Sequence, residues 1–182
     1  MAVAKNQADE RLLRLAVKGD AAAFRALLDA YYPVIYRMAF RLTATRHDAE
    51  DVTQMASMKI AQNIGTFKGE SSFSTWIYTI VLNSYRDWKR TQSRHYADNI
   101  DDLTDLEAGA PDPENLMGLS EEMRRINALP EPEREIVFLV FGEGLTHKEA
   151  GKIIGCAEST ISWRIHEARK ILSKSEGKHG HG

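Results

Sequence analysis

The sequence predicts an all-α protein made of two small helical domains joined by a flexible acidic linker. Apolar residues recur at helical spacing in both halves of the 182-residue chain, and no segment alternates with period two between hairpin turns. Residues 96–118 differ from both halves, because they are acidic and contain Pro111 and Pro113. The predicted domains are therefore residues 1–95 and 119–182, with residues 96–118 as the linker.

Three helical segments are predicted in the N-terminal domain. The first follows Asp20, a candidate N-cap, and Pro33 is expected to kink or interrupt it. The second is predicted to open at Asp48 and to run to Ile64. A polar loop at residues 66–73 separates it from the third, whose apolar stripe is formed by Trp76, Ile77, Ile80, Val81, Ser84 and Trp88.

The C-terminal domain is predicted to contain a helix-turn-helix. Thr146 and Glu149 have the spacing of a capping box, and Gly155 stands where the first helix must stop and turn. The second helix is expected to start at Glu158 or Ser159, with a core stripe formed by Ile161, Ile165, Ala168 and Leu172. In DNA-binding proteins the second helix of this motif enters the major groove. A plain helical hairpin with a solvated charged face is the alternative.

Composition and charge exclude several classes of protein. The chain has one Cys, no secretory signal and no apolar run that could span a bilayer, so a cytoplasmic protein without membrane insertion is expected. We find no phosphate-binding Gly loop, nucleophile elbow or Cys/His metal spacing, and expect no enzyme, catalytic residue, metal or cofactor. The net charge of −2 hides an asymmetry: residues 1–95 carry +5 and residues 96–120 carry −7.

Two features of the N-terminal domain indicate binding surfaces. Asp48, Glu50, Asp51 and Gln54 lie outside the apolar stripe of their helix, as a basic partner helix would require, although acids also favour a helix N-terminus by themselves. Six aromatic residues fall within 22 residues and end in a basic run, which suits the bases and phosphates of an unpaired strand. These aromatic residues could equally form a core. They are Phe67, Phe73, Trp76, Tyr78, Tyr85 and Trp88.

Taken in order, these segments resemble the extracytoplasmic-function (group IV) sigma factors of bacterial RNA polymerase. The resemblance covers residues 10–173 and rests on DAEDVTQ, TFKGESSFSTWIYTIVLNSYRDWKR, the acidic linker and LPEPEREIVFLVFGEGLTHKEAGKIIGCAESTISWRIHEARKIL. It implies core RNA polymerase as partner, through the β′ clamp helices and the β subunit, together with promoter DNA and an anti-sigma factor. The clamp contacts would be Asp48, Glu50, Asp51 and Gln54.

The resemblance also implies two sets of DNA contacts. Those to the melted minus-ten element would be Lys68, Ser71, Phe73, Asn83, Arg86, Trp88, Lys89 and Arg90. Those to the minus-thirty-five duplex would be Ser159, Thr160, Ser162, Trp163, Arg164, His166, Glu167, Arg169 and Lys170. The linker would thread the polymerase as a nucleic-acid mimic, or act only as a solvated spacer.

Three departures from the family pattern accompany this resemblance. Met55 stands where many members have Glu, and Ser162 and Glu167 stand where a basic residue is frequent. Arg164 is then the clearest base-reading candidate, because Arg can contact guanine bidentately. A stand-alone helix-turn-helix regulator, which needs no polymerase-binding helix, is the alternative function.

Overall fold

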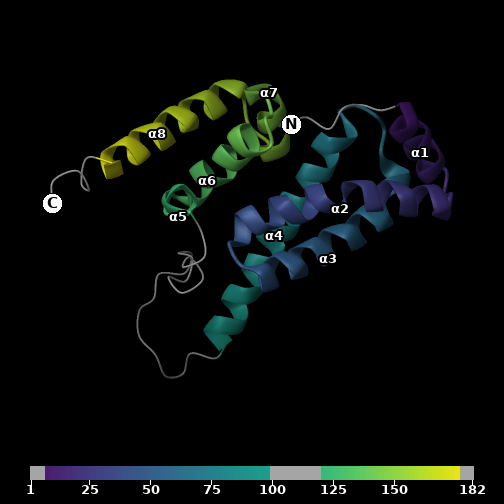
Figure 1. Cartoon of the computed structure of the whole chain (residues 1–182), viewed down its shortest axis with the longest axis horizontal. Helices are drawn as coiled ribbons and strands as arrows, with labels where there is room; N and C mark the ends of the chain where they lie inside the picture. Colours follow the sequence, from purple (N-terminus) through teal and green to yellow (C-terminus); the bar gives the residue numbers. More distant parts are fainter. Residues whose placement is uncertain (1–6, 99–119, 177–182) are drawn as a thin grey trace. The chain divides into compact units, whose positions relative to one another are not determined.

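The computed structural model describes residues 7–98 and 120–176, and every regular element within these two ranges is helical (Figure 1). The chain divides into two compact units, Met1–Gln92 and Ser93–Gly182. The all-α prediction is therefore confirmed. Most of the predicted linker lies outside the described residues, so its boundaries stay predictions. None of the described helices is both long and apolar enough to cross a bilayer.

The first unit is built from four helices and a short 3₁₀ turn. These are α1 (Gln7–Val17), α2 (Ala21–Thr43), α3 (Arg46–Asn63), η1 (Ile64–Thr66) and α4 (Phe73–Asp98). Helix α1 packs on α2, and α2 packs on α3 (Figure 1). Their core contains large side chains that are almost completely buried, among them Leu27, Ile35, Met38, Val52, Ile60, Ile77, Val81 and Leu82.

Helix ends in this unit follow local chemistry. The side chain of Asp20 accepts a hydrogen bond of 2.8 Å from the backbone of Ala23, so the predicted N-cap is confirmed. Helix α2 continues through Pro33, which is exposed, and the predicted interruption is absent. Helix α3 begins at Arg46 rather than at Asp48, because Thr45 supplies the cap by accepting from the Asp48 backbone at 3.1 Å.

The second unit contains α5 (Glu121–Asn127), α6 (Glu131–Val137), one π-helical turn η3 (Phe138–Gly142), α7 (His147–Ile154) and α8 (Glu158–Glu176). Helices α5, α6 and α7 all contact α8. The core between them is formed by Ile136, Leu139, Ile153, Ile161 and Ile165. Arg125 ties α5 to α8 by donating a 2.7 Å hydrogen bond to the carbonyl of Leu172.

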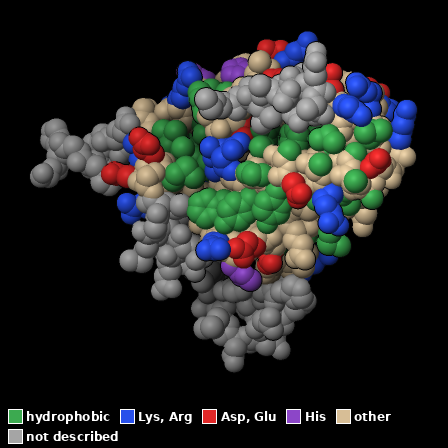
Figure 2. Space-filling view, turned by 45° about the vertical axis from the view of Figure 1, so that its right-hand side comes forward, with side chains coloured by type: hydrophobic (Ala, Val, Ile, Leu, Met, Phe, Trp, Pro, Cys, Tyr) green, Lys and Arg blue, Asp and Glu red, His purple; other side chains and the backbone are tan. Residues whose placement is uncertain are grey.

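Some large apolar side chains remain at the surface. Figure 2 shows one face, on which hydrophobic side chains gather among side chains of both charges. The large apolar side chains with the highest exposure are Tyr32, Met58, Phe141 and Trp163. Single exposed apolar residues are common on protein surfaces. Exposure alone therefore does not indicate that any of these four residues has a function.

Candidate nucleic-acid interface

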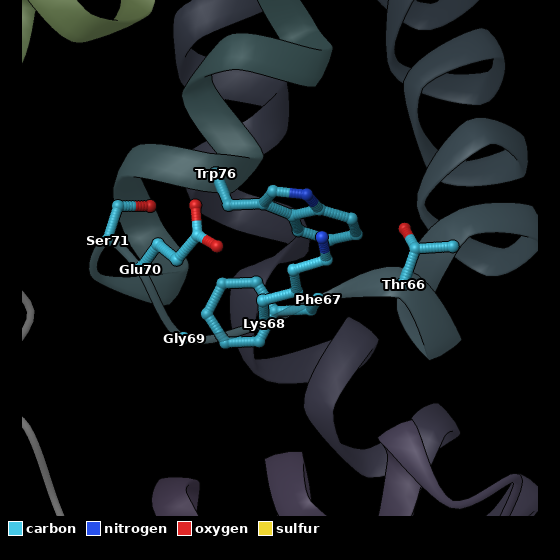
Figure 3. A pocket seen from close by; sticks show the side chains of 7 residues that line it. All are labelled: Thr66, Phe67, Lys68, Gly69, Glu70, Ser71 and Trp76. Atoms are coloured by element: carbon cyan, nitrogen blue, oxygen red, sulfur yellow. The ribbon is translucent and has the colours of Figure 1, made fainter.

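A polar loop and the start of α4 enclose a small hollow of about 180 Å³. It is lined by Thr66, Phe67, Lys68, Gly69, Glu70, Ser71 and Trp76. In Figure 3 the Phe67 ring and the Trp76 indole border this space, and the Lys68 side chain reaches toward the indole. Its volume is well below the roughly 300–1,000 Å³ of sites for drug-sized molecules. The hollow is therefore too small for a drug-sized molecule.

Aromatic packing gives Phe67 and Trp76 their positions. The two ring centroids are 5.5 Å apart, and each ring also packs on Phe73, at 5.4 and 5.5 Å. Phe73 itself is only 8% exposed and meets Tyr31 edge-on at 5.1 Å. Of the predicted minus-ten residues, Lys68 and Ser71 line the hollow, whereas Phe73 supports it from the core.

The polar side of α4 carries the other predicted minus-ten residues. Asn83 and Arg90 are exposed, while Arg86 and Lys89 are half-buried. Trp88 stacks on the buried Tyr85 at 6.2 Å, and its enclosed indole nitrogen has no hydrogen-bond partner among the described residues. Trp88 therefore packs on Tyr85 with part of its ring buried, and its contact with bases stays a prediction.

An ion-pair network fixes this part of α4. Lys59 of α3 lies 2.6 Å from Asp87, which also pairs with Arg90. Hydrogen bonding from Lys59, and then from Arg90, holds the pKa of the Asp87 carboxyl below its ordinary value. Arg90 thus pairs with a neighbour three positions earlier on its own helix, a spacing that the sequence could have indicated. The pair between Lys59 and Asp87 joins two helices, and no local spacing indicates it.

The start of α3 presents the four predicted clamp contacts outside its buried stripe. Glu50 and Gln54 are exposed, and Asp48 and Asp51 are half-buried. Asp48 accepts a 2.7 Å hydrogen bond from the Thr45 hydroxyl, so its carboxylate belongs to the helix cap. Glu50 pairs with Arg46 at 3.0 Å, and Asp51 lies 4.0 Å from His47. Such exposed pairs are weak and can exchange partners.

The helix-turn-helix prediction is confirmed in detail. Thr146 and Glu149 form both hydrogen bonds of the capping box, at 3.2 and 2.9 Å, and Gly155 ends α7 with a φ of 84°. The Glu149 carboxylate accepts hydrogen bonds from the Thr146 backbone N–H at 2.9 Å and from the Thr146 hydroxyl at 2.7 Å, and these two bonds, the backbone one first, lower the pKa of the carboxyl. Gly151 is a second requirement of the turn, since a Cβ there would lie 2.8 Å from the carbonyl oxygen of Cys156.

Helix α8 places the predicted minus-thirty-five residues in different surroundings. Those that are exposed are Ser159, Ser162, Trp163, His166, Arg169 and Lys170, whereas Thr160, Arg164 and Glu167 are half-buried. Arg164 donates to Glu133 of α6 at 2.7 Å, and Arg169 lies over the Phe141 ring at 5.5 Å. Ser162 lies 2.8 Å from Nδ1 of His147, and Lys170 lies 3.8 Å from Glu167.

Comparison with known families agrees with this division of surfaces. The sigma-70 region 2 profile matches residues 27–95, and the sigma-70 region 4 profile matches residues 119–172. The ECF RNA polymerase sigma-E factor of Escherichia coli K12 is 32% identical over 177 residues, which cover 90% of this chain and 92% of that protein. The chain belongs to the ECF sigma factors.

Other members of the sigma factor family give the same result. The sigma-E factor of Haemophilus influenzae Rd is 31% identical over 184 residues, covering 93% of this chain and 96% of that protein. The sigma factor RpoE of Bartonella quintana, solved with the anti-sigma factor NepR, superposes with a TM-score of 0.68 at 26% identity, over 83% and 94% of the two chains. CnrH, solved with the cytosolic domain of CnrY, has a TM-score of 0.69 at 21% identity, over 95% and 99%, and supports the fold.

This chain is therefore an alternative sigma factor, and the hollow and α8 lie in its regions 2 and 4, respectively. A stand-alone helix-turn-helix regulator would not require a region 2. The group IV assignment and the roles of the individual site residues stay predictions.

Proposed function

We propose that this sigma factor binds core RNA polymerase, directs it to specific promoters and assists their melting. One observation carries the proposal: a single chain has an aromatic hollow beside a basic helix in region 2 and a helix-turn-helix in region 4. The first arrangement suits an unpaired base and the second suits duplex DNA. Domains at residues 1–95 and 119–182, joined by residues 96–118, would separate these tasks.

The minus-ten step would use the hollow. Unpairing a base costs a few kcal/mol, and stacking on Phe67 or Trp76 would offset that cost by about 1–3 kcal/mol. We expect the melted strand to meet Lys68, Asn83 and Arg90, which are all exposed, through its phosphates or the polar edges of its bases. Phe67 and Trp76 join the proposed contact set, while Phe73 supports them through packing.

Control by an anti-sigma factor in the cytoplasm completes the proposal. The related Bartonella quintana sigma factor was solved in complex with an anti-sigma factor. A partner of this kind would keep the polymerase-binding surface of α3 covered until it is released.

Co-elution with core RNA polymerase on a size-exclusion column tests the proposal. The wild-type chain should form a stable complex with the polymerase. Asp51→Arg should weaken that complex, because the Asp51 side chain is 45% exposed and the substitution would bring a positive charge against a basic partner. Glu10→Arg on α1 is the matched control, since it makes the same charge change at an exposed site of the same unit. Tight duplex binding without any polymerase complex would instead favour the stand-alone regulator.

A further inference from the structure

One face of α8 points away from the rest of its domain. The buried stripe of α8 is formed by Ile161, Ile165 and Ala168. With 100° of rotation per residue, the opposite side of the helix carries Ser159, Trp163, His166 and Lys170. All four are exposed, and we refer to them as the outward arc of α8. A duplex that takes α8 into its major groove would meet this arc first.

The two arginines of α8 flank the outward arc and are turned toward the domain. Arg164 donates to Glu133 at 2.7 Å, with side-chain exposures of 30% and 11%. Removing Arg164 from this pair would leave a nearly buried carboxylate without its partner, which is strongly unfavourable. Arg169 lies over the Phe141 ring. The side chain of Ser162 is committed as well, because it contacts His147 and donates to the carbonyl of Glu158 at 3.1 Å.

Trp163 is then the largest group that the outward arc offers to DNA. It is 58% exposed, and the Arg164 guanidinium lies 5.9 Å from its ring centroid, which orients the indole. In the major groove, an apolar or aromatic side chain distinguishes thymine by its C5 methyl group.

We propose that Trp163 is the specificity-determining residue of α8, and that it reads thymine in the minus-thirty-five duplex through apolar contact with the C5 methyl. Arg164 is a positioning residue, anchored on Glu133 and holding the indole, rather than a reader of guanine. The inference rests on the proposed function, because it requires α8 to enter the major groove of promoter DNA.

The test uses the full chain bound to core RNA polymerase and a pool of promoter duplexes randomised over the minus-thirty-five positions. Wild-type holoenzyme should enrich thymine at one or two positions. Replacing that thymine by deoxyuridine removes only the methyl group, and should weaken binding about fourfold, the equivalent of one buried methylene-sized group. Trp163→Ala should lose both the thymine preference and the sensitivity to deoxyuridine, and Trp163→Phe should keep most of both.

Tyr32→Ala on α2 is the matched control, because it removes an exposed aromatic side chain outside region 4 and should leave the thymine preference intact. Arg164→Ala and Glu133→Gln should weaken the same thymine preference, since both release the guanidinium that orients the indole. Binding that is insensitive to deoxyuridine, or a guanine preference lost only in Arg164→Ala, would overturn the inference while leaving the sigma function in place. Failure to form any holoenzyme would overturn both.

Discussion

At the scale of single residues, burial separates supporting aromatics from those that can touch a base. Phe67, Phe73 and Trp76 belong to one aromatic run of the sequence, and each pair of them packs at about 5.5 Å. Phe67 and Trp76 line the hollow, whereas Phe73 lies in the core with Tyr31. The sequence alone left both possibilities open for this run, because a stacking platform and a core are built from the same side chains.

Phe73→Ala should therefore act on stability. Removing a buried aromatic ring leaves a cavity, and we expect a loss of about 3–5 kcal/mol in the free energy of unfolding, measured by urea denaturation. Glu70→Ala in the neighbouring loop is the control, because an exposed change should stay within about 0.5 kcal/mol. A fully stable Phe73→Ala variant would contradict the placement of this ring in the core.

Lys68→Ala should act on DNA and leave stability unchanged, because Lys68 is exposed at the rim of the hollow. If it meets a phosphate of the melted strand, its loss should weaken binding of a single-stranded minus-ten probe by the holoenzyme. The slope of log affinity against log salt should become shallower by about 0.7. Lys68→Arg keeps the charge and should keep the slope, and an unchanged slope in Lys68→Ala would remove Lys68 from the contact set.

At the scale of elements, local chemistry predicted the helix ends well where the signal was a side-chain cap. Asp20, the Thr146–Glu149 box and Gly155 all act as expected. Thr45 caps α3 ahead of the acid-rich run. Pro33, which is predicted to kink or interrupt its helix, lies within the continuous α2. A proline removes one hydrogen bond, and the buried side of a long helix can compensate for that loss.

The capping box of α7 makes stability depend on pH. Hydrogen bonds from Thr146 favour the charged form of Glu149, so the pKa of its carboxyl is lower in the folded protein than in the unfolded chain. In the unfolded chain the pKa of a Glu side chain is about 4.3. The stabilisation is therefore present above about pH 4.3 and is lost as the pH falls through the folded pKa. Gln keeps the cap geometry without the charge. The difference in unfolding free energy between wild type and Glu149→Gln should be largest at neutral pH and should shrink in acid.

Urea titrations followed by circular dichroism at several pH values measure this difference. In a Thr146→Ala background the pH dependence assigned to Glu149 should become smaller but should not vanish. That variant removes the hydroxyl that donates to the carboxylate, but it keeps the backbone N–H of residue 146, which is the larger cause of the lowered pKa of Glu149. A difference that stays constant from pH 7 down to pH 3.5 would show that the charge of Glu149 contributes nothing to the cap.

At the scale of the whole molecule, the order of the motifs predicted the fold class and the two sigma-70 regions. It did not predict which charged side chains pair within the fold. Arg164 pairs with a residue 31 positions earlier, and Lys59 pairs with one 28 positions later. Such partners become visible only once the helices pack, because no local spacing links them. For the same reason, the sequence favours Arg164 as the base reader, whereas the structure pairs its side chain with Glu133.

The net charge of the whole chain conceals how unevenly its charged residues are distributed. Seven acids and no basic residue fall within residues 96–120, against an excess of five basic residues in residues 1–95. Carboxylates tethered beside basic surfaces compete with phosphates for them. Replacing the seven acidic residues of this segment by Asn or Gln changes the net charge of the chain from −2 to +5. This replacement should raise the affinity of the free protein for duplex DNA. The seven are Asp98, Asp101, Asp102, Asp105, Glu107, Asp112 and Glu114.

Fluorescence anisotropy of a labelled duplex between about 50 and 200 mM salt would measure this effect, because counterion release makes the contribution of each charge visible in the salt slope. A scrambled segment with the same seven acids is the control, and should bind DNA as weakly as wild type if charge rather than sequence is responsible. Equal affinity of the amide variant and wild type at every salt concentration would mean that the acidic segment is a solvated spacer. The affinity of the free protein for duplex DNA would then be set by its two folded units alone.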